Sequence, residues 1–272
     1  MKNQLLDELG QVNHMVDLDR VFSTLRTSWV EQWMTLPKVL DDCQHVLFDT
    51  HTPLSSASQS MISAAKLVCE TIERSSQSSF EPAYHNRLHF ADAMVSLTTL
   101  MRLQAQATHL SSPDWMACLL LTVSALDFTH PGGANAHHRQ IEHQTLISLQ
   151  ALLESRVDMK WLSIVMELIL RTDPADVPGN HQKVAGQAFQ WNTDWTCVLL
   201  NEADILASAS SLHGPGLSAA LADEWKRAQH PLHAVVATPA GRVHFLKSIQ
   251  FSSTASQILG IEQMVQAQCQ SQ

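Results

Sequence analysis

Two histidines four residues apart are the residues of this 272-residue chain whose type and spacing most directly suggest chemistry. His85 and His89 belong to the segment YHNRLHFAD, and residues at this spacing share one face of a helix. Apolar residues continue the helical period behind them at Phe90, Met94 and Leu97. The pattern therefore predicts a buried helix that presents two imidazoles to a polar cavity, where a metal site could be built.

Three carboxylates and one more histidine lie near the ends of other predicted helices. Asp127 and His130 belong to DFTHPGG, Glu142 belongs to IEHQTL, and Asp204 belongs to EADILA. Imidazole together with carboxylate suits a hard or borderline divalent metal that activates water. Taken singly, most of these residues have an ordinary explanation as caps, turns or surface groups. Asp204 differs, because a carboxylate within the apolar frame CVLLNEADILA is costly to bury unless it is paired or binds a metal.

Helical periodicity covers most of the chain, and no strand alternation is convincing. The segment from Trp115 to Leu126 is apolar on nearly every side, which indicates a central helix surrounded by others. No linker is long enough to separate domains, so we predict an all-α, single compact multi-helix domain. Within residues 1–272, a helical part (1–80) would precede the part that holds the metal site and substrate pocket (81–266). The expected helices are 15–50, 56–74, 88–107, 115–126, 139–155, 160–171, 195–208, 217–229 and 242–266, with a polar loop or short helix over 174–194.

Composition excludes several classes of protein. Hydrophobic residues make up 45% of the chain and charged residues 16%, which argues against disorder, while a mean hydropathy of -0.06 argues against a membrane protein. The net charge of -9 argues against binding to nucleic acid or to an anionic membrane. The N-terminus does not resemble a secretory signal, which predicts a cytoplasmic protein. The five scattered cysteines form no CxxC pair and are expected to be small buried hydrophobic residues.

Four segments carry a resemblance to a known family. YHNRLHFAD, DFTHPGGAN, ILRTD at 169–173 and EADILA at 202–207 occur in the same order as the signature segments of the class I cyclic nucleotide phosphodiesterases. Residues 80–250 resemble that family, an all-helical branch of the HD metal-dependent phosphohydrolases. The resemblance implies hydrolysis of a 3′,5′-cyclic nucleotide or related small phosphodiester by a metal-bound hydroxide. The implied cofactors are one or two divalent ions (Zn, Mg or Mn), the implied partner is a small anionic phosphoester or nucleotide, and a homodimer is compatible with it.

The resemblance also assigns roles to individual residues. It implies that His85 is the general acid that protonates the departing ribose oxygen and that His130 lies beside the metal-bound water. Glu142 would orient or deprotonate that water, and Asp127 would bridge two metal ions. The implied metal ligands are His89, Asp127 and Asp204.

Leu126 departs from the family pattern. The family has a His-Asp pair where this chain has Leu126 and Asp127, so one imidazole ligand of the first metal is missing. Three protein ligands plus water can still form a catalytic site, but the affinity for metal should fall. Spacing alone leaves open whether another histidine replaces the missing nitrogen. The candidates are His137, His138 and His181.

The substrate-binding residues depart as well. Tyr84 opens the first motif and is expected to contact the substrate. In GRVHFLKSI, Phe245 matches the phenylalanine that clamps the purine, but Arg242 stands where the family has glutamine. Arginine only donates hydrogen bonds, so Arg242 could serve guanine O6, a carboxylate or a second phosphate, but could not accept the amino hydrogens of adenine. The alternative is an ordinary surface arginine.

Three functional hypotheses follow. The first is a metal-dependent phosphodiesterase, which accounts for the catalytic and metal-binding candidates together. The second is a catalytically impaired relative that binds a nucleotide or a protein partner without turnover, as Leu126 suggests. A redox protein with a di-iron site ranks last, because it needs more histidine ligands than the motifs supply. The presence of His85 and Glu142 favours the first hypothesis, since a noncatalytic binder has no chemical need for them.

Overall fold

The helix that begins within the two-histidine segment runs through the centre of the fold. In the computed structural model, which describes residues 4–30, 34–48, 53–77 and 80–271, this helix is α5 (Arg87–Thr108). Its N-cap is Asn86, whose side-chain oxygen accepts hydrogen bonds from the backbone N–H groups of Leu88 and His89. Every residue from His89 to Met101 is buried, because other helices pack around α5. His89 therefore lies in the first turn of α5, whereas His85 precedes the N-cap, so the prediction that both histidines lie on one helix is wrong for His85.

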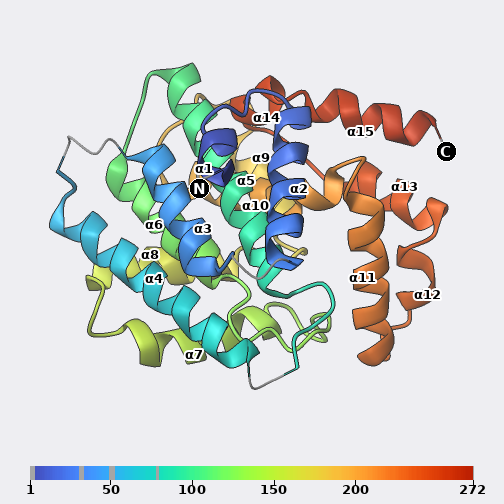
Figure 1. Cartoon of the computed structure of the whole chain (residues 1–272), viewed down its shortest axis with the longest axis horizontal. Helices are drawn as coiled ribbons and strands as arrows, with labels where there is room; N and C mark the ends of the chain where they lie inside the picture. Colours follow the sequence, from blue (N-terminus) through green and yellow to red (C-terminus); the bar gives the residue numbers. More distant parts are fainter. Residues whose placement is uncertain (1–3, 31–33, 49–52, 78–79, 272) are drawn as a thin grey trace.

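The described residues contain helices and no strands, which confirms the all-α prediction, and they form one compact domain (Figure 1). None of these helices is long and apolar enough to cross a membrane. The helices are α1 (Gln4–Leu9), α2 (Met15–Val30), α3 (Leu36–Leu47), α4 (Ser56–Ser76), α5, α6 (Pro113–Ala125), α7 (Gln140–Leu153), α8 (Met159–Leu170), α9 (Val177–Val184), α10 (Thr193–Ala209), α11 (Gly214–Arg227), α12 (His233–Val236), α13 (Pro239–Ser248), α14 (Thr254–Ile258) and α15 (Ile261–Gln270).

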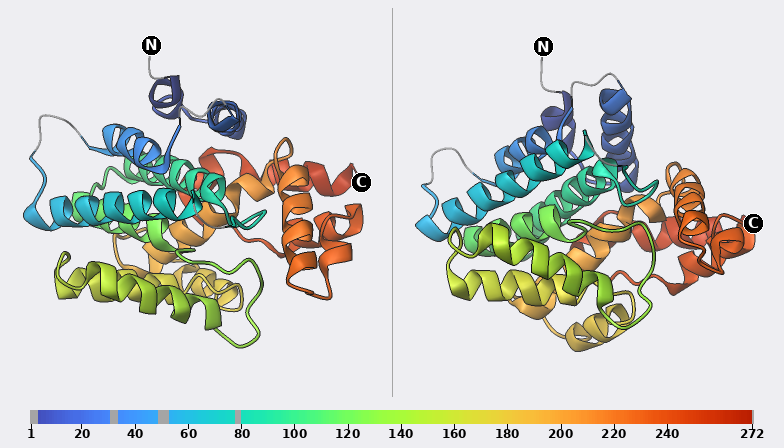
Figure 2. Two further views of the ribbon diagram at one scale, coloured as in Figure 1. Left: turned by 60° about the horizontal axis from the view of Figure 1, so that its bottom comes forward. Right: turned by 90° about the horizontal axis from the view of Figure 1, so that it is seen from below.

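The core lies around α5, α6 and α10. Helix α6 is buried along its length between α4, α5 and α8, as its uniformly apolar sequence predicts. Helix α10 packs along α5, which brings the segment EADILA beside the two-histidine segment. Helices α11, α12 and α13 lie together at one side of the molecule (Figures 1 and 2). The candidate site forms where α11 meets the ends of the central helices.

Several element boundaries differ from the sequence prediction. The predicted helix over 15–50 is divided into α2 and α3, where Pro37 stands in the first turn of α3; residues 31–33 and 49–50 lie outside the described residues. The segment 242–266 is divided into parts of α13, α14 and α15. Ser253 caps α14, and Gly260 adopts a φ of 72° before α15. Four of the five cysteines, at positions 43, 69, 118 and 197, are buried as expected of small hydrophobic residues, whereas Cys269 is only partly buried.

Candidate metal centre and active site

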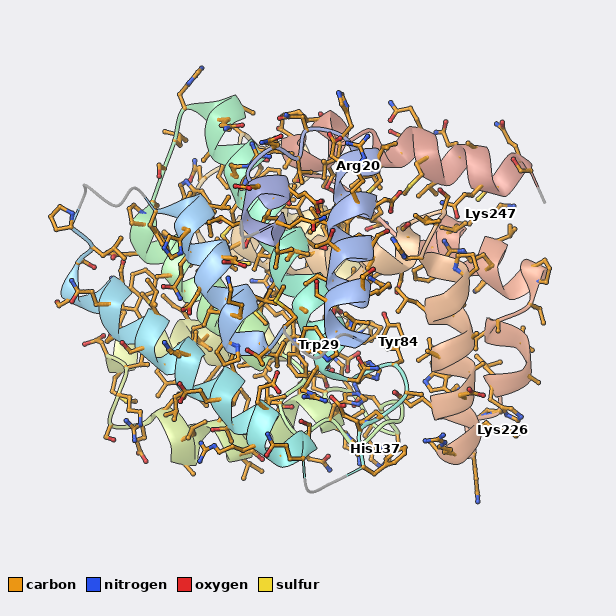
Figure 3. The ribbon with its side chains drawn as sticks, in the orientation of Figure 1. Arg20, Trp29, Tyr84, His137, Lys226 and Lys247 are labelled. Carbon is orange, nitrogen blue, oxygen red and sulfur yellow. The ribbon has the colours of Figure 1, made fainter. Side chains whose placement is uncertain are left out.

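One cavity collects most of the chemistry-bearing residues. It has a volume of about 670 Å³. Its lining comes from the segment before α5, the loop between α6 and α7 with the start of α7, the segment after α8, parts of α10 and α11, and the loop after α11. In Figure 3, Tyr84 and His137 lie on the side of the central helices that faces α11. The sequence-predicted residues that line this cavity are Tyr84, His85, Asp127, His130, Glu142 and Asp204.

His89 does not itself line this cavity, but it faces two carboxylates that do. Its Nε2 is 3.0 Å from Asp127 Oδ2 and 3.1 Å from Asp204 Oδ1, and its side chain is 5% exposed. One imidazole nitrogen carries at most one hydrogen, so it cannot satisfy both oxygens, and Asp204 Oδ1 is left without a hydrogen bond. The three possible ligand atoms lie within 4.8 Å of one another. This convergence of one nitrogen and two carboxylate oxygens fits a divalent cation such as Zn²⁺ or Mn²⁺.

The protonation of these residues depends strongly on their neighbours. Burial alone would lower the pKa of His89, but Tyr84, Asp127 and Asp204 raise it well above the ordinary value. Burial would raise the pKa of Asp127, yet His85, the hydrogen bond from His89, and His130 hold it well below the usual range. Asp127 therefore stays ionised. A proton and a metal ion compete for the same nitrogen of His89.

His85, Asp127 and His130 form a second cluster of possible ligands. The rings of His85 and His130 stack with their centroids 3.7 Å apart. His130 Nδ1 accepts a hydrogen bond of 3.0 Å from the backbone N–H of Gly132, so we infer that the ring hydrogen lies on Nε2. Burial, followed by the nearby charge of His85, lowers the pKa of His130 to about 4 and keeps the ring neutral. In this arrangement Nδ1 of His130 is occupied by the backbone N–H of Gly132, and its Nε2–H is available as a hydrogen-bond donor.

Glu224 is a site residue that sequence reasoning missed. Its Oε1 lies 2.5 Å from His85 Nδ1, and its Oε2 accepts hydrogen bonds from the backbone N–H groups of Tyr84 and His85 at 2.9 and 3.0 Å. Burial alone would raise the pKa of Glu224. The hydrogen bond and the charge of His85 outweigh this effect and lower the pKa below its ordinary value, so the carboxylate stays ionised. This contact fixes the orientation of the His85 ring. It involves Nδ1 only, so Glu224 does not occupy Nε2.

The sequence around Glu224 indicates a buried carboxylate but not its partner. Glu224 belongs to ALADEWKRAQ, which is typical of a solvated helix, and lies 139 residues after His85. However, it follows Leu217 and Leu221 by seven and three residues, so it continues the inward-facing stripe of α11. A carboxylate at such a position, 2% exposed in the structure, needs a partner.

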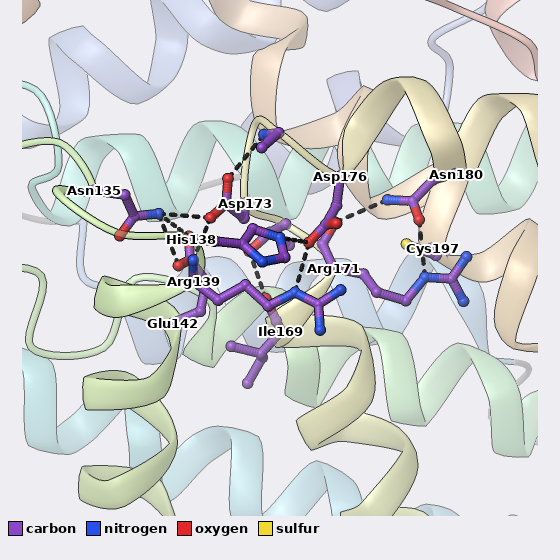
Figure 4. A network of polar contacts seen from close by, with 12 residues as sticks. Asn135, His138, Arg139, Glu142, Ile169, Arg171, Asp173, Asp176, Asn180 and Cys197 are labelled. Carbon is purple, nitrogen blue, oxygen red and sulfur yellow. Dashed lines mark hydrogen bonds and ion pairs between the residues drawn. The ribbon is translucent and has the colours of Figure 1, made fainter.

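Glu142 is held by Asn135, which also binds Asp173, and neither residue has a predicted site role (Figure 4). Asn135 Nδ2 donates to Glu142 Oε2 at 2.9 Å and to Asp173 Oδ2 at 3.0 Å. Asp173 in turn accepts hydrogen bonds from the backbone N–H groups of Arg139 and Ala175, at 2.5 and 2.8 Å. Burial raises the pKa of Glu142, which improves it as a proton acceptor near neutral pH. The network keeps this carboxylate on the cavity wall.

Leu126 lines the cavity and is 4% exposed. His137 and His138 also line the cavity, but neither belongs to a described ligand cluster, and His138 Nε2 is 3.1 Å from Asp176 Oδ2. His181 contacts Ser252 Oγ through Nδ1 at 2.7 Å and lines a different cavity. Among the described residues, none of the three histidines proposed as a substitute joins the ligands around His89.

Arg242 and Phe245 are not brought to the cavity. Arg242 is 4% exposed, and its guanidinium donates to the backbone carbonyl groups of Ser208, Ala209 and Ser210 and to Gln268 Oε1. It therefore binds the C-terminal carbonyl groups of α10. Its guanidinium lies 5.7 Å from the centre of the Phe245 ring. Arg242 thus neither reaches the cavity, where it could contact a base, nor lies on the surface.

No family model and no curated protein matches the sequence. Among solved structures, a Leishmania PDEB1 phosphodiesterase in complex with IBMX is similar, with a TM-score of 0.54 and 12% sequence identity. The match covers 100% of this chain and 96% of that one. At this level of identity the likeness concerns the fold alone. Together with the observed helices, it shows that this chain has the all-helical fold of a phosphodiesterase.

Proposed function

We propose that this protein is a metal-dependent phosphodiesterase that hydrolyses a 3′,5′-cyclic nucleotide or a related small phosphodiester. The observation that carries the proposal is the convergence of His89, Asp127 and Asp204, the last two of which line one cavity together with His85. Such a set supplies cation ligands and a proton donor at the same place. The similarity in fold to a phosphodiesterase supports the same reaction class.

Each residue of the site has a separate role in the proposed hydrolysis. A divalent ion bound here would polarise the phosphoryl group and make a neighbouring water more acidic. The water oxygen bonds to phosphorus as the bond from phosphorus to the ribose oxygen breaks. Glu142 takes the proton that the water loses, and His85 gives a proton to the departing oxygen. His130 offers its Nε2–H to the phosphoryl oxygens, while Glu224 holds His85 in position.

Metal analysis followed by a hydrolysis screen tests this proposal. We expect purified protein to contain zinc or manganese, or to take up either metal when it is added. It should then hydrolyse cyclic nucleotides or simple diesters, and a chelator should abolish turnover. The Asp127→Asn variant, which weakens a metal ligand, serves as the negative control. Absence of metal and of turnover with zinc, manganese and magnesium would overturn the proposal.

Restoring the missing imidazole provides a second prediction. Because Leu126 lines the cavity, Leu126→His should add a fourth protein ligand and tighten metal binding by about tenfold or more, since even loss of an outer-shell partner costs roughly 10- to 100-fold. Leu126→Phe adds a ring without a nitrogen and is the matched control. Metal affinity would be measured by competition with a chromophoric chelator. Equal affinity in both variants would mean that residue 126 does not reach the ion.

A further inference from the structure

The cavity is polar at its metal-binding end, whereas its wall on the α11 side is largely apolar and aromatic. If the proposed function holds, this wall determines which substrates can bind. Beyond the metal ligands, the α11 side is formed by Leu221, Trp225, His230 and Leu232. Phe245, the aromatic residue expected to clamp a base, does not line the cavity. Trp225 therefore provides the large aromatic surface on this side.

Trp225 is held in place from two directions. It directly follows Glu224, so the indole lies on the same turn of α11 as the carboxylate that holds His85, the proposed acid. His230 folds back after the end of the helix: its backbone N–H donates to the carbonyl of Trp225 at 2.8 Å, and the two rings lie 4.2 Å apart. The indole is partly exposed. It is thus a supported aromatic surface that a ligand can reach.

The charges around the cavity restrict what a ligand can carry. Four carboxylates line it, those of Asp127, Glu142, Asp173 and Asp204. No lysine or arginine of the described chain lines it, and the guanidinium of Arg242 is bound to α10. Bound cations and a protonated His85 can neutralise one phosphate beside the metal ligands. A second phosphate farther along the cavity would meet no lysine or arginine, only the imidazoles of His137, His138 and His230, and would be repelled by the carboxylates.

We propose that the cavity selects a phosphodiester with a single phosphate, and that Trp225 supplies the face on which an uncharged ring of that substrate packs. Purine 3′,5′-cyclic mononucleotides fit this description, whereas cyclic dinucleotides, with two phosphates, do not. Trp225 thereby replaces Phe245 as the residue that contacts the base.

Substrate comparison with Trp225 variants tests the inference. For cyclic AMP, Trp225→Ala should raise KM by about tenfold, with kcat little changed, because stacking of a base on an aromatic side chain is worth roughly that factor or more. Trp225→Phe should restore most of the affinity. The base-free analogue methyl riboside 3,5-cyclic phosphate should show no change in KM with either variant. Trp161→Ala, a truncation of a tryptophan that packs against Trp115 outside the cavity, is the matched control.

Two further measurements complete the design. Cyclic di-AMP should show a large loss of kcat/KM relative to cyclic AMP, and an equal value would overturn the single-phosphate part of the inference. An unchanged KM for cyclic AMP in Trp225→Ala, or an equal rise for the base-free analogue, would overturn the role of Trp225. Calorimetric binding of the phosphorothioate analogue of cyclic AMP reports on Trp225 without turnover. Tenfold weaker binding to Trp225→Ala would therefore support this inference even without turnover. Absence of hydrolysis of every diester would overturn only the proposed function.

Discussion

Glu224→Gln is expected to lower kcat for cyclic nucleotides by roughly 10²- to 10⁴-fold, the range associated with loss of general acid catalysis, without changing the metal content. The Glu224 carboxylate contacts His85 Nδ1 and accepts two backbone hydrogen bonds from Tyr84 and His85. Glutamine has nearly the same shape but no charge, so it stabilises the protonated imidazole less. It can also donate to Nδ1, which would favour the wrong tautomer of His85.

The leaving group of the substrate distinguishes positioning of an acid from a general structural effect. A p-nitrophenyl diester has a good leaving group that needs little protonation, so its hydrolysis should be much less affected by Glu224→Gln. Asp223→Asn removes the same charge from the exposed neighbouring position of α11 and should behave like the unmodified protein. An equal loss on both classes of substrate would contradict the assignment of Glu224 to His85.

Removal of the Arg242 side chain is expected to cause the largest loss of stability among these variants. Its guanidinium lies at the C-terminus of α10, where carbonyl groups have no partner within the helix, and donates to Ser208, Ala209 and Ser210. Arg242→Met would remove the donor to the Ser208 carbonyl and to Gln268 Oε1, at about 1–3 kcal/mol for each unsatisfied group. The carbonyl groups of Ala209 and Ser210 would each lose one of two hydrogen bonds, because they also accept from Gln268 Nε2 and from the backbone N–H of Gly214. We therefore expect the free energy of unfolding to fall by about 3 kcal/mol.

Arg242→Gln makes the experiment decisive, because glutamine is the residue of the phosphodiesterase pattern at this position. If the side chain faced a substrate base, this change would alter base preference and leave stability nearly unchanged. If it binds the end of α10, the midpoint of denaturant unfolding should fall with both variants. Lys247→Met, on an exposed position of the same helix α13, is the control. Stability equal to that of the control would contradict the structural role.

The sequence determined the local features of this protein. Helical periodicity located α4, α5, α6, α8 and α10 to within a few residues, because the spacing of apolar side chains is a property of each segment alone. The two-histidine segment placed His89 in the first turn of a helix, whereas His85, predicted on the same helix face, lies before the N-cap Asn86. The ordered motifs predicted the phosphodiesterase fold and named His89, Asp127 and Asp204, which the structure brings together. These conclusions needed no knowledge of how the helices pack.

Tertiary structure decided which side chains face one another. Glu224 comes 139 residues after its partner His85, and no local pattern relates the two. Arg242 matched a substrate-binding position in sequence, yet the packing of α13 against the end of α10 directs its guanidinium to carbonyl groups instead of the cavity. Trp225 had no assigned role until α11 was placed beside the metal ligands. The spacing of residues fixes positions along one helix, whereas the direction of a side chain depends on how that helix packs against others.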